Sequence, residues 1–155
     1  MKANEKLVLD MIRAVAERDE DRILEIYDRD VEFHWPPALP YGGTYRGREV
    51  LDMNRAFADA WDPVQTSEEA RRIHPRVVAS NDEEVVVHYH QRGTDPSGRT
   101  CDSEVLAIYR VEHGKVTRLQ MFYFEPEKVA DFLAEAARQS VRWARSRPTR
   151  RRGLR

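Results

Sequence analysis

Two histidines, His88 and His90, stand two positions apart in a segment whose side chains alternate as in a β-strand. Side chains at i and i+2 of a strand point to the same face, with about 7 Å between their Cα atoms. Histidine titrates closer to neutral pH than any other side chain, which suits proton transfer. In apolar surroundings the two rings cannot easily both be charged. The pattern therefore predicts an acid–base pair.

Other readings of this pair stay open. The rings could be hydrogen-bonded core histidines, or they could face solvent if the strand register differs by one residue. A His-x-His pair can also begin a metal site, which needs a third ligand. The candidate His34 falls on the wrong face, so we predict no metal. Gly42-Gly43 lacks the spacing of a phosphate-binding loop, so we predict no nucleotide and no other cofactor.

The turn at residues 95–98 is expected to fix which face the histidines occupy. If these residues form a four-residue loop, Thr94 faces Arg99, and counting back places His88 opposite Val105. Both imidazoles then point to the inner face. Asp102 and Glu104 fall on the outer face by the same alternation.

The expected site is an apolar pocket with a few polar groups, which is the usual composition of a small-molecule site. The predicted catalytic residues are His88, His90 and Tyr123, the last as a hydroxyl donor to a carbonyl oxygen. The predicted substrate-binding residues are Met11, Phe33, Trp35, Ser103, Val105, Ala107, Tyr109, Leu119 and Met121.

The periodicity of the apolar residues predicts an α+β fold. Helices are expected at about 4–18, 21–27, 48–61 and 127–143, and strands at 31–35, 73–79, 84–92, 100–111 and 116–124. A curved antiparallel sheet would wrap around the N-terminal helices. Both faces of that sheet carry apolar residues, whereas a sheet with one wet face should alternate cleanly. We therefore predict a homodimer through the convex face.

Length and charge limit the function classes. The 155 residues fit one domain, expected at 1–143, followed by a basic and flexible tail at 144–155. The net charge is −1, but eight arginines and no acids follow position 137, which leaves about −9 on the body. We predict no nucleic-acid partner, because phosphate contacts need clustered basic residues. No apolar run is long enough to span a membrane, and the single cysteine is consistent with a cytoplasmic location.

Several segments together resemble the nuclear-transport-factor-2-like (NTF2-like) superfamily, which includes ketosteroid isomerases, limonene-epoxide hydrolases and SnoaL-type polyketide cyclases. These segments are Tyr45-Arg46-Gly47-Arg48-Glu49, Pro96-Ser97-Gly98-Arg99, the run Ile108–Val116 and Tyr123-Phe124-Glu125-Pro126. The resemblance covers about residues 5–137 and implies a cone-shaped α+β barrel.

The resemblance also narrows the expected chemistry. The positions of the ketosteroid isomerase base and oxyanion donors fall at Trp35, Met11 and Ala107, so that machinery is missing. The arginine and aspartates of the epoxide hydrolases are missing as well. A SnoaL-type cyclase, isomerase or dehydratase remains, acting without a cofactor on a hydrophobic carbonyl compound such as a polyketide. The alternatives are a non-catalytic binder of a lipophilic molecule and an epoxide-opening enzyme of the same fold.

Overall fold

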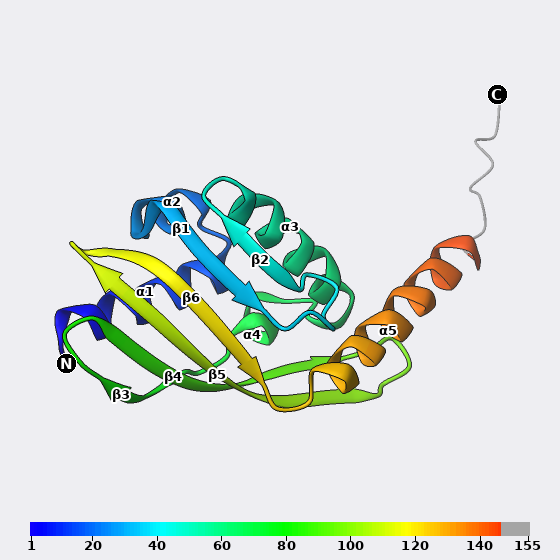
Figure 1. Ribbon diagram of the computed structural model, residues 1–155. Helices are drawn as coiled ribbons and strands as arrows, with labels where there is room; N and C mark the ends of the chain where they lie inside the picture. The colour runs from blue at the N-terminus through cyan, green and yellow to red at the C-terminus, as the bar shows by residue number, and fades with distance from the viewer. Residues whose placement is uncertain (147–155) are drawn as a thin grey trace, which may run out of the picture.

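The computed structural model describes residues 1–146, which form a curved six-stranded sheet with helices on its concave face (Figure 1). This confirms the predicted fold class, although the sheet does not close into a barrel. The elements in chain order are α1 (Ala3–Glu17), α2 (Glu20–Ile26), β1 (Tyr27–Trp35), β2 (Gly43–Arg46), α3 (Glu49–Trp61), the 3₁₀ turn η1 (Asp62–Val64), α4 (Glu68–Arg71), β3 (Arg76–Ser80), β4 (Glu84–Thr94), β5 (Thr100–Glu112), β6 (Lys115–Tyr123) and α5 (Pro126–Ser146).

The strands lie in the order β2-β1-β6-β5-β4-β3. The pair β1–β6 is parallel, and every other neighbouring pair is antiparallel. The longest ladder joins β4 to β5, where Glu84 pairs with Arg110 and Thr94 with Thr100 at the two ends. Strand β2 and helix α4 were not predicted from the sequence, because each has only four residues and shows no clear periodicity.

The register of the β4–β5 hairpin differs from the prediction by one residue. Thr94 pairs with Thr100 and not with Arg99. The loop is Pro96-Ser97-Gly98, closed by a 2.9 Å hydrogen bond from the Gly98 N–H to the Asp95 carbonyl. Gly98 has φ +89°, the left-handed conformation that commonly ends a three-residue hairpin loop. The predicted four-residue loop was therefore wrong. A shift of one residue in the pairing moves every side chain of β4 to the opposite face relative to β5.

The inner face of the sheet is the core. Val85, Val87, Val105 and Ala107 are fully buried there. Their outward neighbours, such as Leu106, are only half-buried. Both faces of β4 and β5 therefore carry apolar side chains, but only the inner one is covered by the chain's own helices.

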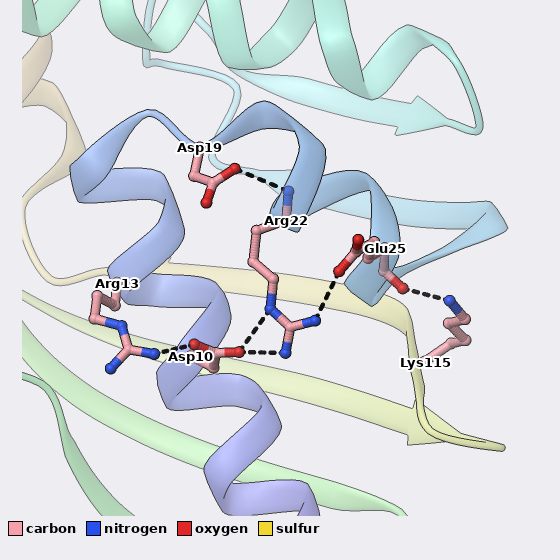
Figure 2. Close-up of polar contacts among 6 residues, drawn as sticks. All are labelled: Asp10, Arg13, Asp19, Arg22, Glu25 and Lys115. Carbon is pink, nitrogen blue, oxygen red and sulfur yellow. Dashed lines mark hydrogen bonds and ion pairs between the residues drawn. The ribbon is translucent and has the colours of Figure 1, made fainter.

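A group of charged side chains holds α1 and α2 together and ties α2 to the sheet (Figure 2). Asp10 of α1 forms ion pairs with Arg13 in its own helix and with Arg22 of α2. Arg22 also contacts Glu25 at 2.9 Å. The Lys115 ammonium group at the start of β6 donates to the Glu25 carbonyl. These contacts connect α1 to the start of β6 through α2.

Helix α5 begins at Pro126, where the ring cannot disrupt a helical hydrogen bond. Val129, Phe132, Leu133 and Ala136 are buried, and the second half of the helix runs away from the sheet (Figure 1). The helix includes residues 144–146 of the predicted tail. The rest of that tail lies outside the described residues.

Candidate functional site

An apolar cavity lies between the concave face of the sheet and the helices α1 and α3. It measures about 90 Å³, and about 670 Å³ when the solvent at its open mouth is counted. It is lined by Met11, Ile12, Val15 and Ala16 of α1, Asn54 and Phe57 of α3, Phe33 and Trp35 of β1, Tyr89 and Gln91 of β4, Tyr109 of β5, Leu119 and Met121 of β6, and Gln65, Arg71 and Ile73 of the segment between α3 and β3.

Three polar groups of the lining lack protein partners. Gln91 is only 3% exposed, and none of residues 1–146 forms a hydrogen bond with its side-chain amide. The Trp35 Nε1 is buried without a partner in the described part of the chain. The Tyr109 hydroxyl likewise has no hydrogen bond to a described residue, and burial raises its pKa. The Trp35 Nε1 is sealed from solvent, whereas the Gln91 amide and the Tyr109 hydroxyl are open to it, so these two can accept a partner from a bound molecule.

Two further polar residues of the lining are anchored by the backbone. Gln65 is buried, and its Nε2 donates to the Arg92 carbonyl at 2.8 Å. The Arg71 Nε donates to the Ala16 carbonyl of α1 at 2.9 Å. These bonds hold the irregular segment after α3 against α1 and β4. They also leave the remaining polar atoms of Gln65 and Arg71 to line the cavity.

A chain of aromatic hydroxyl groups supports the cavity wall from behind. The Trp61 Nε1 donates to the Tyr41 hydroxyl at 2.9 Å, and the Tyr41 and Tyr123 hydroxyls lie 3.0 Å apart. The Trp35 ring packs edge-on against the Tyr41 ring at 5.0 Å. Burial raises the pKa of both Tyr41 and Tyr123. These phenols therefore stay neutral and fix the position of Trp35.

The predicted catalytic residues do not meet in this cavity. Because of the register shift, His88 and His90 lie on the outer face, opposite Leu106 and Glu104 respectively. Neither ring lines the cavity. The expectation that both imidazoles project inward was wrong. Tyr123 is on the inner face, but it lies behind the lining, with its hydroxyl against Tyr41.

Most of the predicted binding residues do line the cavity. Met11, Phe33, Trp35, Tyr109, Leu119 and Met121 are part of its wall. Val105 and Ala107 have the expected inward orientation but are buried within the core, outside the lining. Ser103 is buried and contributes instead to a separate surface groove beside Cys101 and Phe132.

The sequence analysis did not predict ten residues of the lining, which are Ile12, Val15, Ala16, Asn54, Phe57, Gln65, Arg71, Ile73, Tyr89 and Gln91. Gln91 shares the parity of Val85 and Val87, so the correct hairpin register would have placed it inward. Phe57 belongs to the apolar face of the predicted third helix. Gln65 lies in irregular backbone and Arg71 ends the four-residue helix α4, which is too short to show periodicity, so no signal pointed to them.

The lining defines what the cavity can do chemically. Its polar atoms belong to amides, phenols, an indole and one guanidinium group. Among the described residues, no histidine, carboxylate, cysteine or lysine lines it. The cavity can therefore donate hydrogen bonds to an acceptor such as a carbonyl oxygen. It offers no side-chain base of ordinary strength for proton abstraction.

An open, curved sheet wrapped around helices with a cavity in its hollow defines an NTF2-like protein. The SnoaL-like domain profile matches residues 8–119, so the chain belongs to the family of SnoaL-like domains. No curated protein matches the chain at a significant level. Among the described residues, no helix has the length and apolar character needed to cross a membrane.

Solved structures with the same fold are distant in sequence. Bal32a from a soil-derived mobile gene cassette has a TM-score of 0.70 at 15% identity, over 84% of this chain and 96% of its own. An NTF2-like protein of unknown function from Burkholderia pseudomallei has a TM-score of 0.68 at 23% identity, over 86% and 97%. TerC, co-crystallised with polyporic acid, has a TM-score of 0.66 at 21% identity, over 79% and 92%.

Proposed function

We propose that the inner cavity binds a compact, mainly apolar organic molecule that carries a carbonyl group. The observation that carries this proposal is that the Gln91 amide and the Tyr109 hydroxyl lack protein partners in a mainly apolar lining. An acceptor on the ligand would satisfy at least one of them. The aromatic walls, including Phe33 and Phe57, suit a flat ring system.

The reaction class follows from the same groups. SnoaL-like domains include isomerase and cyclase types, which need negative charge on a carbonyl oxygen to be stabilised. The Tyr109 hydroxyl and the Gln91 amide are suited to that role. We therefore propose carbonyl polarisation as the contribution of this site, in place of a histidine acid–base pair. TerC, which has the same fold, was co-crystallised with polyporic acid, and this supports a small organic molecule as the ligand. A polyketide-type aromatic carbonyl compound is the substrate class we favour.

The experiment compares two ligands of nearly equal shape by calorimetry, 2-acetylnaphthalene and 2-ethylnaphthalene, which differ in the carbonyl oxygen. We expect the ketone to bind about tenfold more tightly, the effect of one buried hydrogen bond. One of the variants Gln91→Leu, Trp35→Phe and Tyr109→Phe should lose this preference while still binding 2-ethylnaphthalene. Gln120→Leu is the matched control, since Gln120 lies on the outer face. Equal binding of the two compounds, or binding of neither, would refute the proposal.

We also propose that two copies of the chain associate through the convex face of the sheet. Val86, Leu106 and Ile108 are half-buried there, and Phe122 on the neighbouring strand is 43% exposed. The chain's own helices all lie on the other side (Figure 1). Sedimentation velocity tests this. A dimer that Leu106→Lys and Phe122→Lys convert to monomer supports it, and a monomeric wild-type chain at micromolar concentration contradicts it.

A further inference from the structure

The register that removes the histidines from the cavity places them beside a carboxylate on the outer face. His88 and His90 are two residues apart on β4, and Glu104 of β5 pairs directly with His90. All three side chains therefore emerge on the same side of the sheet. One nitrogen from each ring and one oxygen of the carboxylate lie within 4.8 Å of one another.

The distances are close to those of a coordinated ion. The Glu104 Oε1 lies 3.8 Å from the Nε2 of His88 and 3.7 Å from the Nε2 of His90. Donor atoms held at tetrahedral angles about 2.0–2.1 Å from zinc are about 3.3–3.5 Å apart. The two Glu104 distances exceed this spacing by a few tenths of an ångström, and the donor atoms of the set lie within 4.8 Å of one another, so a small rotation of the side chains would close the set. The two rings lie edge to face with centroids 5.5 Å apart, which leaves both Nε2 atoms beside Glu104.

A further carboxylate orients one of these ligands. The Nδ1 of His90 lies 2.6 Å from the Oδ1 of Asp102. The other oxygen of Asp102 accepts from the Arg92 Nε at 3.1 Å. A carboxylate that binds the second nitrogen of a histidine fixes the tautomer that leaves Nε2 free. This is the usual outer partner of a metal-bound histidine.

We propose that His88, His90 and Glu104 bind a divalent transition-metal ion, with zinc as the best match, and that Asp102 is a positioning residue for His90. Two imidazoles and one carboxylate are a ligand set used by zinc with water in the fourth position. In the single chain the side chains of His88 and His90 are 20% and 33% exposed, so an ion can reach them from solvent before a second copy covers the convex face. The third ligand is Glu104 of β5 and not the sequence candidate His34, which lies on β1. The site is separate from the cavity and does not depend on its ligand.

The test is calorimetric titration of the untagged, EDTA-treated and dialysed full-length chain with zinc chloride. We expect one ion per chain. His88→Gln, His90→Gln and Glu104→Gln should each weaken zinc binding at least tenfold, and Asp102→Asn should weaken it about tenfold. The matched control is His34→Gln. His34 also pairs with a carboxylate, Glu32, but lies on β1, three strands from β4, and its loss should leave zinc affinity unchanged.

A second readout separates a built site from weak surface binding. Cobalt(II) in place of zinc should give the visible absorption of a four-coordinate ion in the wild-type chain and in His34→Gln, but not in His88→Gln/His90→Gln. Circular dichroism in EDTA should show the same folded state for all variants. Zinc binding that survives the double substitution, or no binding by the wild-type chain, would overturn the proposal.

Discussion

The Asp95 backbone N–H donates to the Arg99 carbonyl at 2.8 Å and closes the β4–β5 hairpin. The Asp95 carboxylate caps the same loop from inside. It accepts from the Ser97 hydroxyl at 2.7 Å, from the Arg99 N–H at 2.9 Å and from the Gln139 amide of α5 at 3.2 Å. This one side chain therefore helps to set the register on which both faces of the sheet depend.

Replacing Asp95 should destabilise the protein in a pH-dependent way. Burial alone would raise the pKa of this carboxyl, but the hydrogen bonds from Ser97, Arg99 and Gln139 outweigh it and lower the pKa to about 2. Since the folded pKa lies below the unfolded value of about 3.9, the carboxylate stabilises the fold above pH 4, and this contribution is lost as the pH falls toward 2.

We therefore expect Asp95→Asn to lower the thermal midpoint at pH 7 by roughly 5 °C. The midpoints of the variant and the wild type should converge as the pH approaches 2. Thermal unfolding followed by circular dichroism at several pH values measures this. A difference between the two proteins that is independent of pH would show that the carboxylate charge is unimportant.

The ion pair between Asp10 and Arg22 should contribute modestly to stability (Figure 2). The hydrogen bond from Arg22 is the main reason that the pKa of Asp10 is lowered. Asp10→Asn should cost about 1 kcal/mol at low salt and less at high salt, since the pair is partly exposed. The effect should disappear as acid protonates the wild-type carboxyl. Arg13→Ala is the control. Its side chain is 65% exposed, so we expect a smaller loss in urea unfolding.

Most helices and strands were predictable, because each is indicated by the spacing of apolar residues within its own segment. The alternation of Val85, Val87 and Tyr89 specifies a strand, and the apolar spacing from Leu7 to Val15 specifies a helix. The inward residues of β1, β5 and β6 follow from such alternation alone. Phe33, Trp35 and Tyr109, with Leu119 and Met121 of β6, were therefore placed correctly in the cavity wall.

The pairing register of β4 and β5 was harder to predict, because it depends on whether the loop between them has an odd or an even number of residues. The left-handed conformation of Gly98 makes the loop three residues long. That single residue decides whether His90 faces Ser103 or Glu104. Two polar residues of the cavity could not be predicted from the sequence either. Gln65 reaches it from irregular backbone and Arg71 from a helix of only four residues, and neither segment has a periodicity that predicts the direction of a side chain.

The buried tyrosines should make the protein sensitive to alkali. Burial raises the pKa of Tyr27, Tyr41, Tyr89, Tyr109 and Tyr123. A raised pKa stabilises the fold below the unfolded value of about 10, and this contribution is lost as the pH rises further, because only the unfolded chain ionises easily. The ultraviolet absorbance of tyrosinate should therefore appear together with the loss of circular dichroism. Ionisation of these five phenols in the folded chain would contradict the burial.

The position of the histidine pair predicts that zinc binding and ketone binding can be abolished separately. Because His88 and His90 lie across the sheet from the cavity, His88→Phe/His90→Phe should leave the affinity for 2-acetylnaphthalene within about twofold of the wild type. The same variant should lose zinc binding. Gln91→Leu provides the reverse comparison, since it alters the cavity and leaves the outer face unchanged. Loss of ketone binding in the histidine variant, with a normal circular dichroism spectrum, would mean that the imidazoles reach the cavity after all. The register of β4 and β5 derived from Thr94 and Thr100 would then be wrong.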